Sequence, residues 1–252
     1  MRPAGSSTTV LRVGRTVPSS GLPLSVEEIL RDLRLHSDPR NLAHLARFGI
    51  PAHNAYGVAA PYLQKFAKRL GQNHELAQKL WATGVREARH LAALIDPPSA
   101  VTSGQMDRWA RDFDSWDLAD GVCGHLFVYT PHAWKKALQW PHWESEMVRR
   151  AGFALMAWLA VHDKDAADAQ FGPCFQLVVK YSEDERHYVK KAVNWALRQI
   201  GKRNASLRAA AITIAEQLRD RPSASARWIG SDALREFRRG RSAVAKRRSN
   251  SV

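Results

Sequence analysis

Trp116 and Asp120 are the two residues of this sequence whose types and spacing most directly suggest chemistry. They lie four positions apart in the segment 113–120, FDSWDLAD. If this segment is helical, side chains at that spacing lie on one face, so an indole and a carboxylate would share one patch of surface. An indole face attracts cations and a carboxylate neutralises them. The pair therefore suits recognition of a flat, positively charged group.

The same segment also fits a purely structural role. Ser115 can cap the start of a helix. Trp116 and Leu118 would then face a core, while Asp117 and Asp120 would simply be solvated. From this stretch alone, both interpretations remain open.

A second candidate surface lies in the expected helix 184–200, where cations surround a tryptophan. Four residues recur there at helical offsets of four, three and four: Lys191, Trp195, Arg198 and Lys202. Cations can bind phosphates while an indole packs against a sugar or a base, so this face is a candidate nucleic-acid contact. The alternative is a half-buried Trp195 among solvated cations, because long basic side chains often cover apolar surface.

Arg149 and Arg150 precede the apolar run 151–161. Neighbouring residues on a helix point about 100° apart, so the two arginines cannot have the same role. One of them can bind a phosphate. Alternatively, both lie on the exposed flank of a core helix.

The charge of the chain indicates a polyanionic partner. Among 252 residues, 38 Lys and Arg outnumber 24 Asp and Glu, which gives a formal net charge of +14. Nucleic acid is the leading partner, and an anionic membrane surface is the second. The most apolar segment, 151–161, is too short to cross a bilayer, so we expect a soluble protein.

Cys123 and Cys174 are too few for a disulfide framework and lack metal-ligand spacing. We interpret them as buried thiols in a reducing cytosol. Cys123 and His125 could begin a zinc site, but no second pair with suitable spacing follows. We therefore expect neither a metal nor a cofactor, in a cytoplasmic protein.

Helix signals dominate from Ser25 onward, and no alternating strand pattern is found. Ser25 and Glu28 have the spacing of a capping box. A second helix is expected from Pro39, and a last one beyond Pro222. Between them we expect helices over 59–70, 73–83, 85–95, 103–112, 115–128, 131–140, 142–161, 165–180, 184–200 and 204–218.

This rhythm of short helices, roughly one every 15 to 20 residues, is typical of paired-helix solenoids. We therefore expect an all-α fold, an α-solenoid of HEAT-like antiparallel helix pairs spanning residues 25–240. An irregular helical bundle is the alternative. Residues 1–24 contain no acid and are expected to form a disordered basic arm, with a transit peptide as the weaker alternative. Residues 241–252 are expected to form a basic C-terminal tail.

Five segments together carry a family resemblance. They are 48–50 (FGI), 80–81 (LW), 113–120 (FDSWDLAD), 149–153 (RRAGF) and 189–202 (VKKAVNWALRQIGK). In this order, between about Phe48 and Phe237, they resemble the DNA alkylation repair enzyme family, the AlkD-like alkylpurine DNA glycosylases built of HEAT-like repeats.

The resemblance implies hydrolysis of the N-glycosidic bond of cationic alkylated purines, such as 3-methyladenine and 7-methylguanine, during base excision repair. The implied partner is double-stranded DNA containing alkylated bases, bound by a monomer that is nucleoid-associated if bacterial. Trp116 and Trp195 resemble the tryptophans that flank the deoxyribose of the lesion. Asp120 resembles the carboxylate at the sugar, and Arg150 the arginine near the backbone of the lesion. The family is known for reaching the sugar without extruding the base.

The residues themselves agree with such chemistry. A purine that already carries a positive charge is a good leaving group, so one carboxylate can suffice where ordinary glycoside hydrolysis needs two. Asp120 would stabilise the positive charge on the sugar and hold or deprotonate a water, while the two indoles attract the cationic sugar. Two alternatives remain open: a non-catalytic basic HEAT-like module that binds damaged or branched DNA, and a protein-interaction scaffold.

Overall fold

The structure, a computed structural model, describes residues 24–249, with side chains described as far as residue 239. Every regular element in this part of the chain is a helix, which confirms the all-α prediction. The α-helices are α1 (Val26–Leu35), α2 (Pro39–Arg47), α3 (Ala60–Leu70), α4 (His74–Ala82), α5 (Arg86–Ile95), α6 (Ser103–Arg111), α7 (Trp116–His125), α8 (Ala133–Gln139), α9 (Glu146–His162), α10 (Gly172–Tyr181), α11 (His187–Lys202), α12 (Ala205–Arg219) and α13 (Ala224–Ser249). Four short 3-10 turns join them: η1 (Pro98–Ala100), η2 (Phe127–Tyr129), η3 (Trp140–His142) and η4 (Asp168–Phe171).

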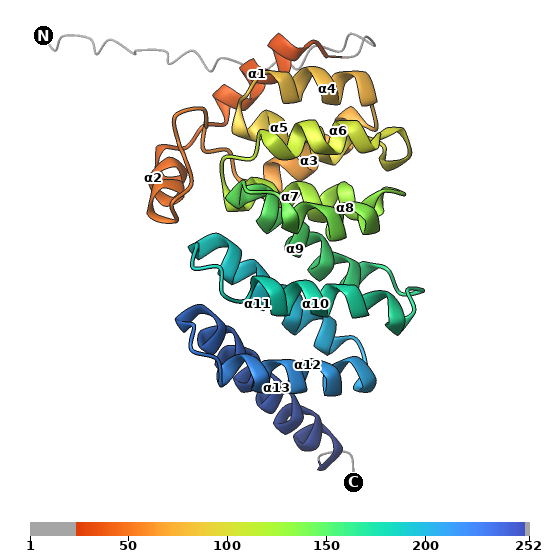
Figure 1. Ribbon diagram of the computed structural model, residues 1–252. Helices are drawn as coiled ribbons and strands as arrows, with labels where there is room; N and C mark the ends of the chain where they lie inside the picture. The colour runs from red at the N-terminus through yellow and green to blue at the C-terminus, as the bar shows by residue number, and fades with distance from the viewer. Residues whose placement is uncertain (1–23, 250–252) are drawn as a thin grey trace, which may run out of the picture.

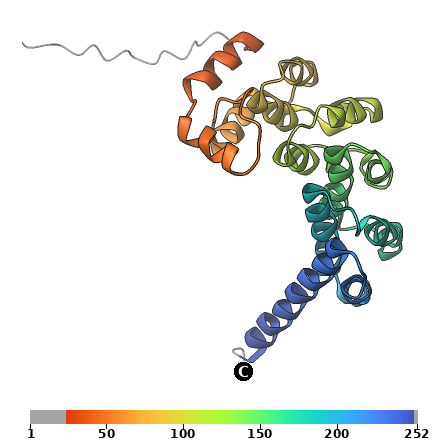
Figure 2. The same ribbon diagram turned by 60° about the vertical axis from the view of Figure 1, so that its left-hand side comes forward.

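The helices stack in two layers along a curved axis (Figures 1 and 2). In one layer α3, α5, α7, α9, α11 and α13 contact one another in succession. In the other layer α4, α8 and α12 pack against α5, α9 and α13, and α10 packs against α11. A stack of this kind buries each apolar helix face against its neighbours, which gives one continuous core. The predicted α-solenoid is therefore confirmed.

Local signals place several helix ends where the sequence predicted them. The Ser25 hydroxyl accepts a hydrogen bond from the Glu28 backbone N–H, and the Glu28 carboxylate accepts one from the Ser25 N–H, which completes the capping box. Helix α3 ends at Gly71, whose φ of 70° favours glycine.

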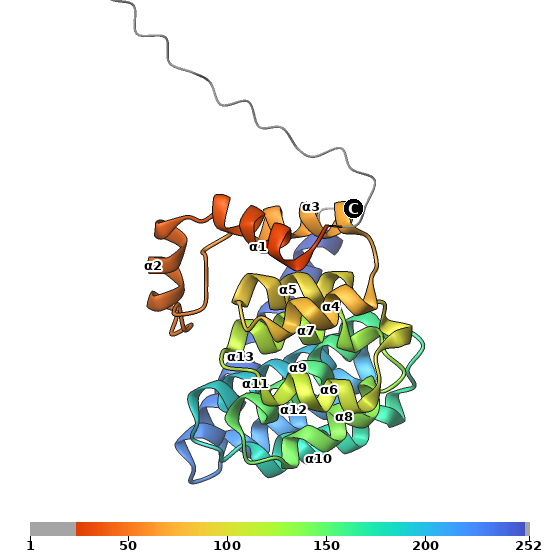
Figure 3. The ribbon, with the colours of Figure 1, turned by 90° about the horizontal axis from the view of Figure 1, so that it is seen from above.

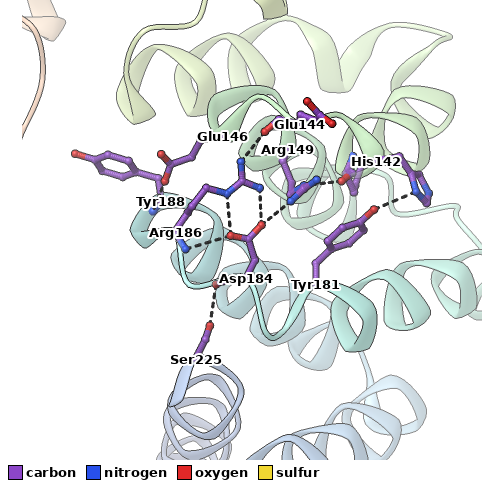
Figure 4. A network of polar contacts seen from close by, with 10 residues as sticks. His142, Glu144, Glu146, Arg149, Tyr181, Asp184, Arg186, Tyr188 and Ser225 are labelled. Atoms are coloured by element: carbon purple, nitrogen blue, oxygen red, sulfur yellow. Dashed lines mark hydrogen bonds and ion pairs between the residues drawn. The ribbon is translucent and has the colours of Figure 1, made fainter. Parts of the chain in front are cut away.

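Helix α11 begins later than the sequence predicted, because the residues before it form a polar network (Figure 4). The expected start was Asp184, but α11 begins at His187. The Asp184 carboxylate instead accepts hydrogen bonds from Arg186 Nε at 2.9 Å and from Arg149 Nη1 at 2.6 Å. Ser225 Oγ donates to the Asp184 carbonyl at 3.0 Å. The network joins α9, the loop before α11 and the start of α13.

Two of the expected boundaries fall at the ends of the chain. The predicted arm, residues 1–24, lies outside the described residues except for its last one. Helix α13 continues to Ser249, so the boundary expected at residue 240 falls inside a helix. No helix in the described part is both long enough and apolar enough to cross a membrane.

Candidate functional site

Asp120 and Arg150 form a bidentate ion pair between α7 and α9. Arg150 Nε donates to Asp120 Oδ1 at 2.9 Å, and Arg150 Nη2 donates to Oδ2 at 2.6 Å. Its third nitrogen, Nη1, donates to the Tyr188 carbonyl at 2.8 Å, at the start of α11. The two paired side chains are only 19% and 8% exposed. One guanidinium therefore joins three successive helices of the same layer and holds the carboxylate in place.

The indole of Trp116 lies beside this ion pair. The guanidinium carbon of Arg150 is 5.8 Å from the centroid of the Trp116 ring. Trp116 Nε1 donates to the Phe48 carbonyl at 3.1 Å, which links the start of α7 to the end of α2. A pocket of about 280 Å³ lies here, lined by Phe48, Trp116, Arg150, His187, Tyr188 and Lys191. The structure thus brings together three of the predicted site residues: Trp116, Arg150 and Lys191.

Trp195 reaches Asp120 through another tryptophan. Its ring meets Trp158 edge-on, with centroids 5.4 Å apart and an interplanar angle of 82°. Trp158 Nε1 donates to the backbone carbonyl of Asp120 at 3.2 Å. Trp195 is half-buried against the core and is not part of the pocket lining.

Sequence reasoning missed Trp158, because this residue lies within the apolar run 151–161 and reads as core. A signal was present in Gly124 on the facing helix α7. A Cβ atom at Gly124 would come within 2.5 Å of the Trp158 ring. The glycine therefore provides the space in which this indole lies against α7.

Burial raises the pKa of Asp120 above its ordinary value, and the Arg150 guanidinium opposes this shift. The bidentate geometry of the pair requires the ionised carboxylate. The site therefore presents a poorly hydrated anion, more basic than a carboxylate in water, beside an indole and in a chain of net positive charge. Such an anion can stabilise a cation that develops next to it.

A comparison with family models gives the classification of the chain. The model of the DNA alkylation repair enzymes matches residues 29–237, which include every site residue described above. The chain belongs to the DNA alkylation repair enzyme family. No curated protein matches it.

A solved structure shares the fold of this family member. It comes from "a new family of proteins related to the HEAT-like repeat DNA glycosylases with affinity for branched DNA structures". The two chains are 23% identical and superpose with a TM-score of 0.74, over 86% of this chain and 96% of that one. The likeness shows the HEAT-like solenoid.

The four cations predicted to contact DNA fall into two groups in this member of the family. Arg150 and Lys191 line the pocket. Arg198 and Lys202, nearer the C-terminal end of α11, both form ion pairs with Glu236 of α13. Arg198 Nη1 also lies 3.9 Å from Asp232 Oδ2. Acids of α13 therefore offset the positive charge at one end of this helix face. A contact of Arg198 and Lys202 with DNA stays a prediction.

Two details expected for α7 in a purely structural role differ in the structure. Ser115 occupies the N-cap position, but its hydroxyl donates to Asp114 at 3.1 Å and accepts no capping bond. Asp117, expected to be solvated, is 13% exposed and lies 3.0 Å from Arg86 Nε and 3.4 Å from His90 Nε2. Burial by itself raises the pKa of Asp117, but His90 and Arg86 hold it well below its ordinary value. These contacts fix the helix that carries Trp116.

The cysteines of this family member are buried free thiols, as predicted. Burial raises the pKa of the Cys123 thiol well above its ordinary value. Within residues 24–239, no group of three or more His, Cys, Asp or Glu side chains is arranged to hold a metal ion.

Proposed function

We propose that this protein hydrolyses the N-glycosidic bond of cationic alkylated purines, such as 3-methyladenine and 7-methylguanine, in double-stranded DNA. One observation carries the proposal: Arg150, which holds the Asp120 carboxylate, lines one pocket together with the Trp116 indole and Lys191, and Asp120 lies directly behind this lining. Arg150 neutralises this carboxylate in the free protein, so the pair does not repel phosphates. The positive charge that develops on the deoxyribose as the base departs is a second cation, which Asp120 can stabilise.

The chemistry proposed for Asp120 requires little from the rest of the site. The departing base takes the bonding electron pair and becomes neutral, so it needs no proton. Each carboxylate oxygen accepts one hydrogen bond from Arg150 and retains a further lone pair, with which it can orient a water. The water adds to the sugar cation, and its proton passes to Asp120 or to solvent.

The tryptophans are proposed to stabilise the same cation more weakly. A cation–π contact contributes about 0.5 to 2 kcal/mol, so two indoles cannot account for most of the acceleration of a glycosylase. Trp116 would act directly from the pocket wall. Trp195 would act beside Trp158, whose Nε1 donates to the backbone carbonyl of Asp120.

The cations at the pocket are proposed to hold the DNA backbone. Lys191 is exposed, and its Nζ lies 4.9 Å from the centroid of the Trp228 ring, so it has no carboxylate partner among the described residues. A phosphate can therefore take that position without breaking an ion pair. Three of the five N–H groups of Arg150 already donate to Asp120 and Tyr188, and the two that remain would donate to the backbone of the lesion.

The test is a base-release assay under single-turnover conditions on a duplex with one 7-methylguanine. The wild-type protein should release the base and leave an alkali-labile site. Asp120→Asn should slow release by about a hundredfold to a thousandfold, the usual cost of one well-placed electrostatic group. Asp165→Asn, a change of an exposed carboxylate outside the site, is the matched control and should release at the wild-type rate. Wild-type release no faster than spontaneous depurination would contradict the proposal.

The second candidate function is non-catalytic binding of damaged or branched DNA. It is favoured by the bidentate ion pair, which already neutralises Asp120, and by the affinity for branched DNA in the name of the similar structure. It predicts tight binding of a four-way junction without base release. Asp120→Asn would then strengthen binding of the junction.

A further inference from the structure

The ring of Phe48 is an exposed apolar surface at the wall of a cation-lined pocket. Phe48 is 50% exposed, and the only other large hydrophobic side chains exposed to this degree within residues 24–239 are Leu35 and Tyr129. Unlike those two, Phe48 shares its pocket with Arg150 and Lys191. Exposing an aromatic ring to water is unfavourable, and the Phe48 ring lies beside Lys191, a cation that has no carboxylate partner among the described residues. The place therefore suits a ligand with both an apolar face and negative charge.

The backbone around this ring is anchored from two sides. The Phe48 carbonyl accepts a hydrogen bond from Trp116 Nε1 of α7, and the Gly49 carbonyl accepts one from the Tyr188 hydroxyl of α11 at 3.4 Å. The next residue, Ile50, is buried. By contrast, α2 buries none of its own residues and stands apart from the stack (Figures 1 and 3). The hydrogen bonds therefore anchor the turn formed by Phe48, Gly49 and Ile50 and not helix α2, which precedes it.

Gly49 is required for this turn. Its φ of 68° lies in the left-handed region, and a Cβ atom there would come within 2.6 Å of the Tyr188 hydroxyl. The chain can therefore turn between Phe48 and Ile50 so that one side chain is buried and the other is exposed. The His44 ring, at 4.6 Å from the Phe48 ring, supports the phenylalanine from α2.

We infer that Phe48 is a wedge that stacks against an unstacked nucleobase of bound DNA. Lys191, helped by the N–H groups of Arg150 that Asp120 and Tyr188 leave free, would hold the flanking phosphates, which brings the neighbouring base to the ring. Every base has an apolar face that an aromatic side chain can cover, and apolar wedges enter DNA where base stacking is already weak. In a fully paired duplex both faces of each internal base are occupied by neighbours. The wedge would therefore give the protein a preference for duplexes that contain an unpaired base.

The inference rests on the part of the proposed function in which DNA is the ligand, but not on base release. Its test uses undamaged DNA and binding alone. The probes are a fully paired duplex and the same duplex with one unpaired 2-aminopurine, whose fluorescence falls when it stacks on an aromatic ring. The variants are Phe48→Ala and Phe48→Trp, with Leu35→Ala as the control at another exposed apolar residue. All of them are compared at one salt concentration, because affinity for DNA depends strongly on salt.

The wild-type protein, Phe48→Trp and Leu35→Ala should prefer the duplex with the unpaired base and quench its fluorescence. Phe48→Ala should lose about five- to a hundredfold in affinity for that duplex, the range for one stacked base, and should bind the paired duplex as before. Because the anchoring bonds use backbone carbonyls, this variant should keep its fold, which circular dichroism checks. An unchanged preference or unchanged quenching in Phe48→Ala would overturn the inference. If the protein prefers the duplex with the unpaired base but releases no alkylated base, the inference about Phe48 holds and the proposed glycosylase activity is contradicted.

Discussion

Arg150 donates to both oxygens of Asp120 and also to the carbonyl of Tyr188, so the proposed catalytic carboxylate and the junction of three helices depend on one guanidinium. A lysine could supply the charge but not the planar fork that makes these three bonds together. The position of Asp120 is therefore coupled to the packing of α7, α9 and α11. Function and stability should respond together when this arginine is changed.

Removing Arg150 should harm both the fold and excision. Arg150→Met leaves the largely buried carboxylate of Asp120 without its partner. Breaking a fully buried pair typically lowers the free energy of unfolding by about 3 to 5 kcal/mol, and the loss should be smaller here because the pair is partly exposed. The pKa of Asp120 should rise further. As the pH is lowered, the variant should therefore lose excision activity at a higher pH than the wild type does, because its carboxylate becomes protonated sooner. Urea unfolding and a pH profile of single-turnover excision measure the two effects. If Arg150→Met/Asp120→Asn is no more stable than Arg150→Met, the loss does not come from the unpaired carboxylate.

The two predicted tryptophans should matter less than Asp120. Trp116→Ala and Trp195→Ala should each slow excision by no more than about thirtyfold, because one cation–π contact contributes about 0.5 to 2 kcal/mol. Affinity for undamaged duplex should be unchanged or slightly higher in Asp120→Asn, since a negative charge near phosphates is gone. Single-turnover rates and duplex binding for the three variants test this order. If a tryptophan variant shows no excision while Asp120→Asn excises at the wild-type rate, ring contacts rather than Asp120 provide most of the catalysis.

Lys191 should contribute more to DNA binding than Arg198 or Lys202. The logarithm of the affinity for duplex should fall linearly with the logarithm of salt concentration, with a slope of roughly −0.9 per phosphate neutralised. Lys191→Met should reduce the magnitude of that slope by about one unit. Arg198→Met and Lys202→Met should change it less, because both cations already pair with Glu236 and Arg198 also lies near Asp232.

Glu236→Gln provides the matching control for this prediction. It releases Arg198 and Lys202 from their acidic partner. If these residues lie near phosphates, the variant should bind duplex more tightly and with a steeper salt dependence. If the wild type and Lys191→Met show equal slopes of log affinity against log salt concentration, Lys191 does not contact DNA phosphates.

Asp184 should stabilise the fold in a pH-dependent way. Burial raises its pKa, but the hydrogen bonds from Arg186 and Arg149 outweigh this and lower the pKa from 3.8 to about 2 (Figure 4). A carboxylate with a depressed folded-state pKa contributes stability that is present above its unfolded pKa and is lost as pH falls through the folded pKa. Solvent screening weakens such a contribution, so Asp184→Asn should lower the free energy of unfolding by about 1 to 2 kcal/mol at pH 7.

The effect of Asp184→Asn should shrink between pH 3.8 and about 2, where the wild-type carboxylate becomes protonated. Urea unfolding of both proteins at pH 7 and at pH 3 measures the difference. Asp165→Asn serves again as the control at an exposed acid. A difference of the same size at both pH values would show that Asp184 acts through its shape rather than its charge.

Much of the fold could be predicted from residues that are close together in the sequence. The capping box of Ser25 and Glu28 and the glycine at position 71 act within one helical turn, and the sequence placed both helix ends correctly. The same holds for the grouping of Trp116 with Asp120, which depends only on helical periodicity. Where a longer contact intervenes, the prediction failed. Helix α11 starts three residues late because Arg149, from another helix, holds Asp184 in the preceding loop.

By itself, the sequence determined the all-α solenoid, most helix ends and the placement of Trp116 and Asp120 on one helix, because helical period and capping are local properties of the chain. Only the tertiary structure decided which charges remain available. Glu236 pairs with Arg198 across 38 positions, Arg150 reaches Asp120 across 30, and the Phe48 carbonyl meets Trp116 across 68. Such pairings depend on how the helices stack, and helix stacking brings together residues whose distance along the chain says nothing about their distance in space.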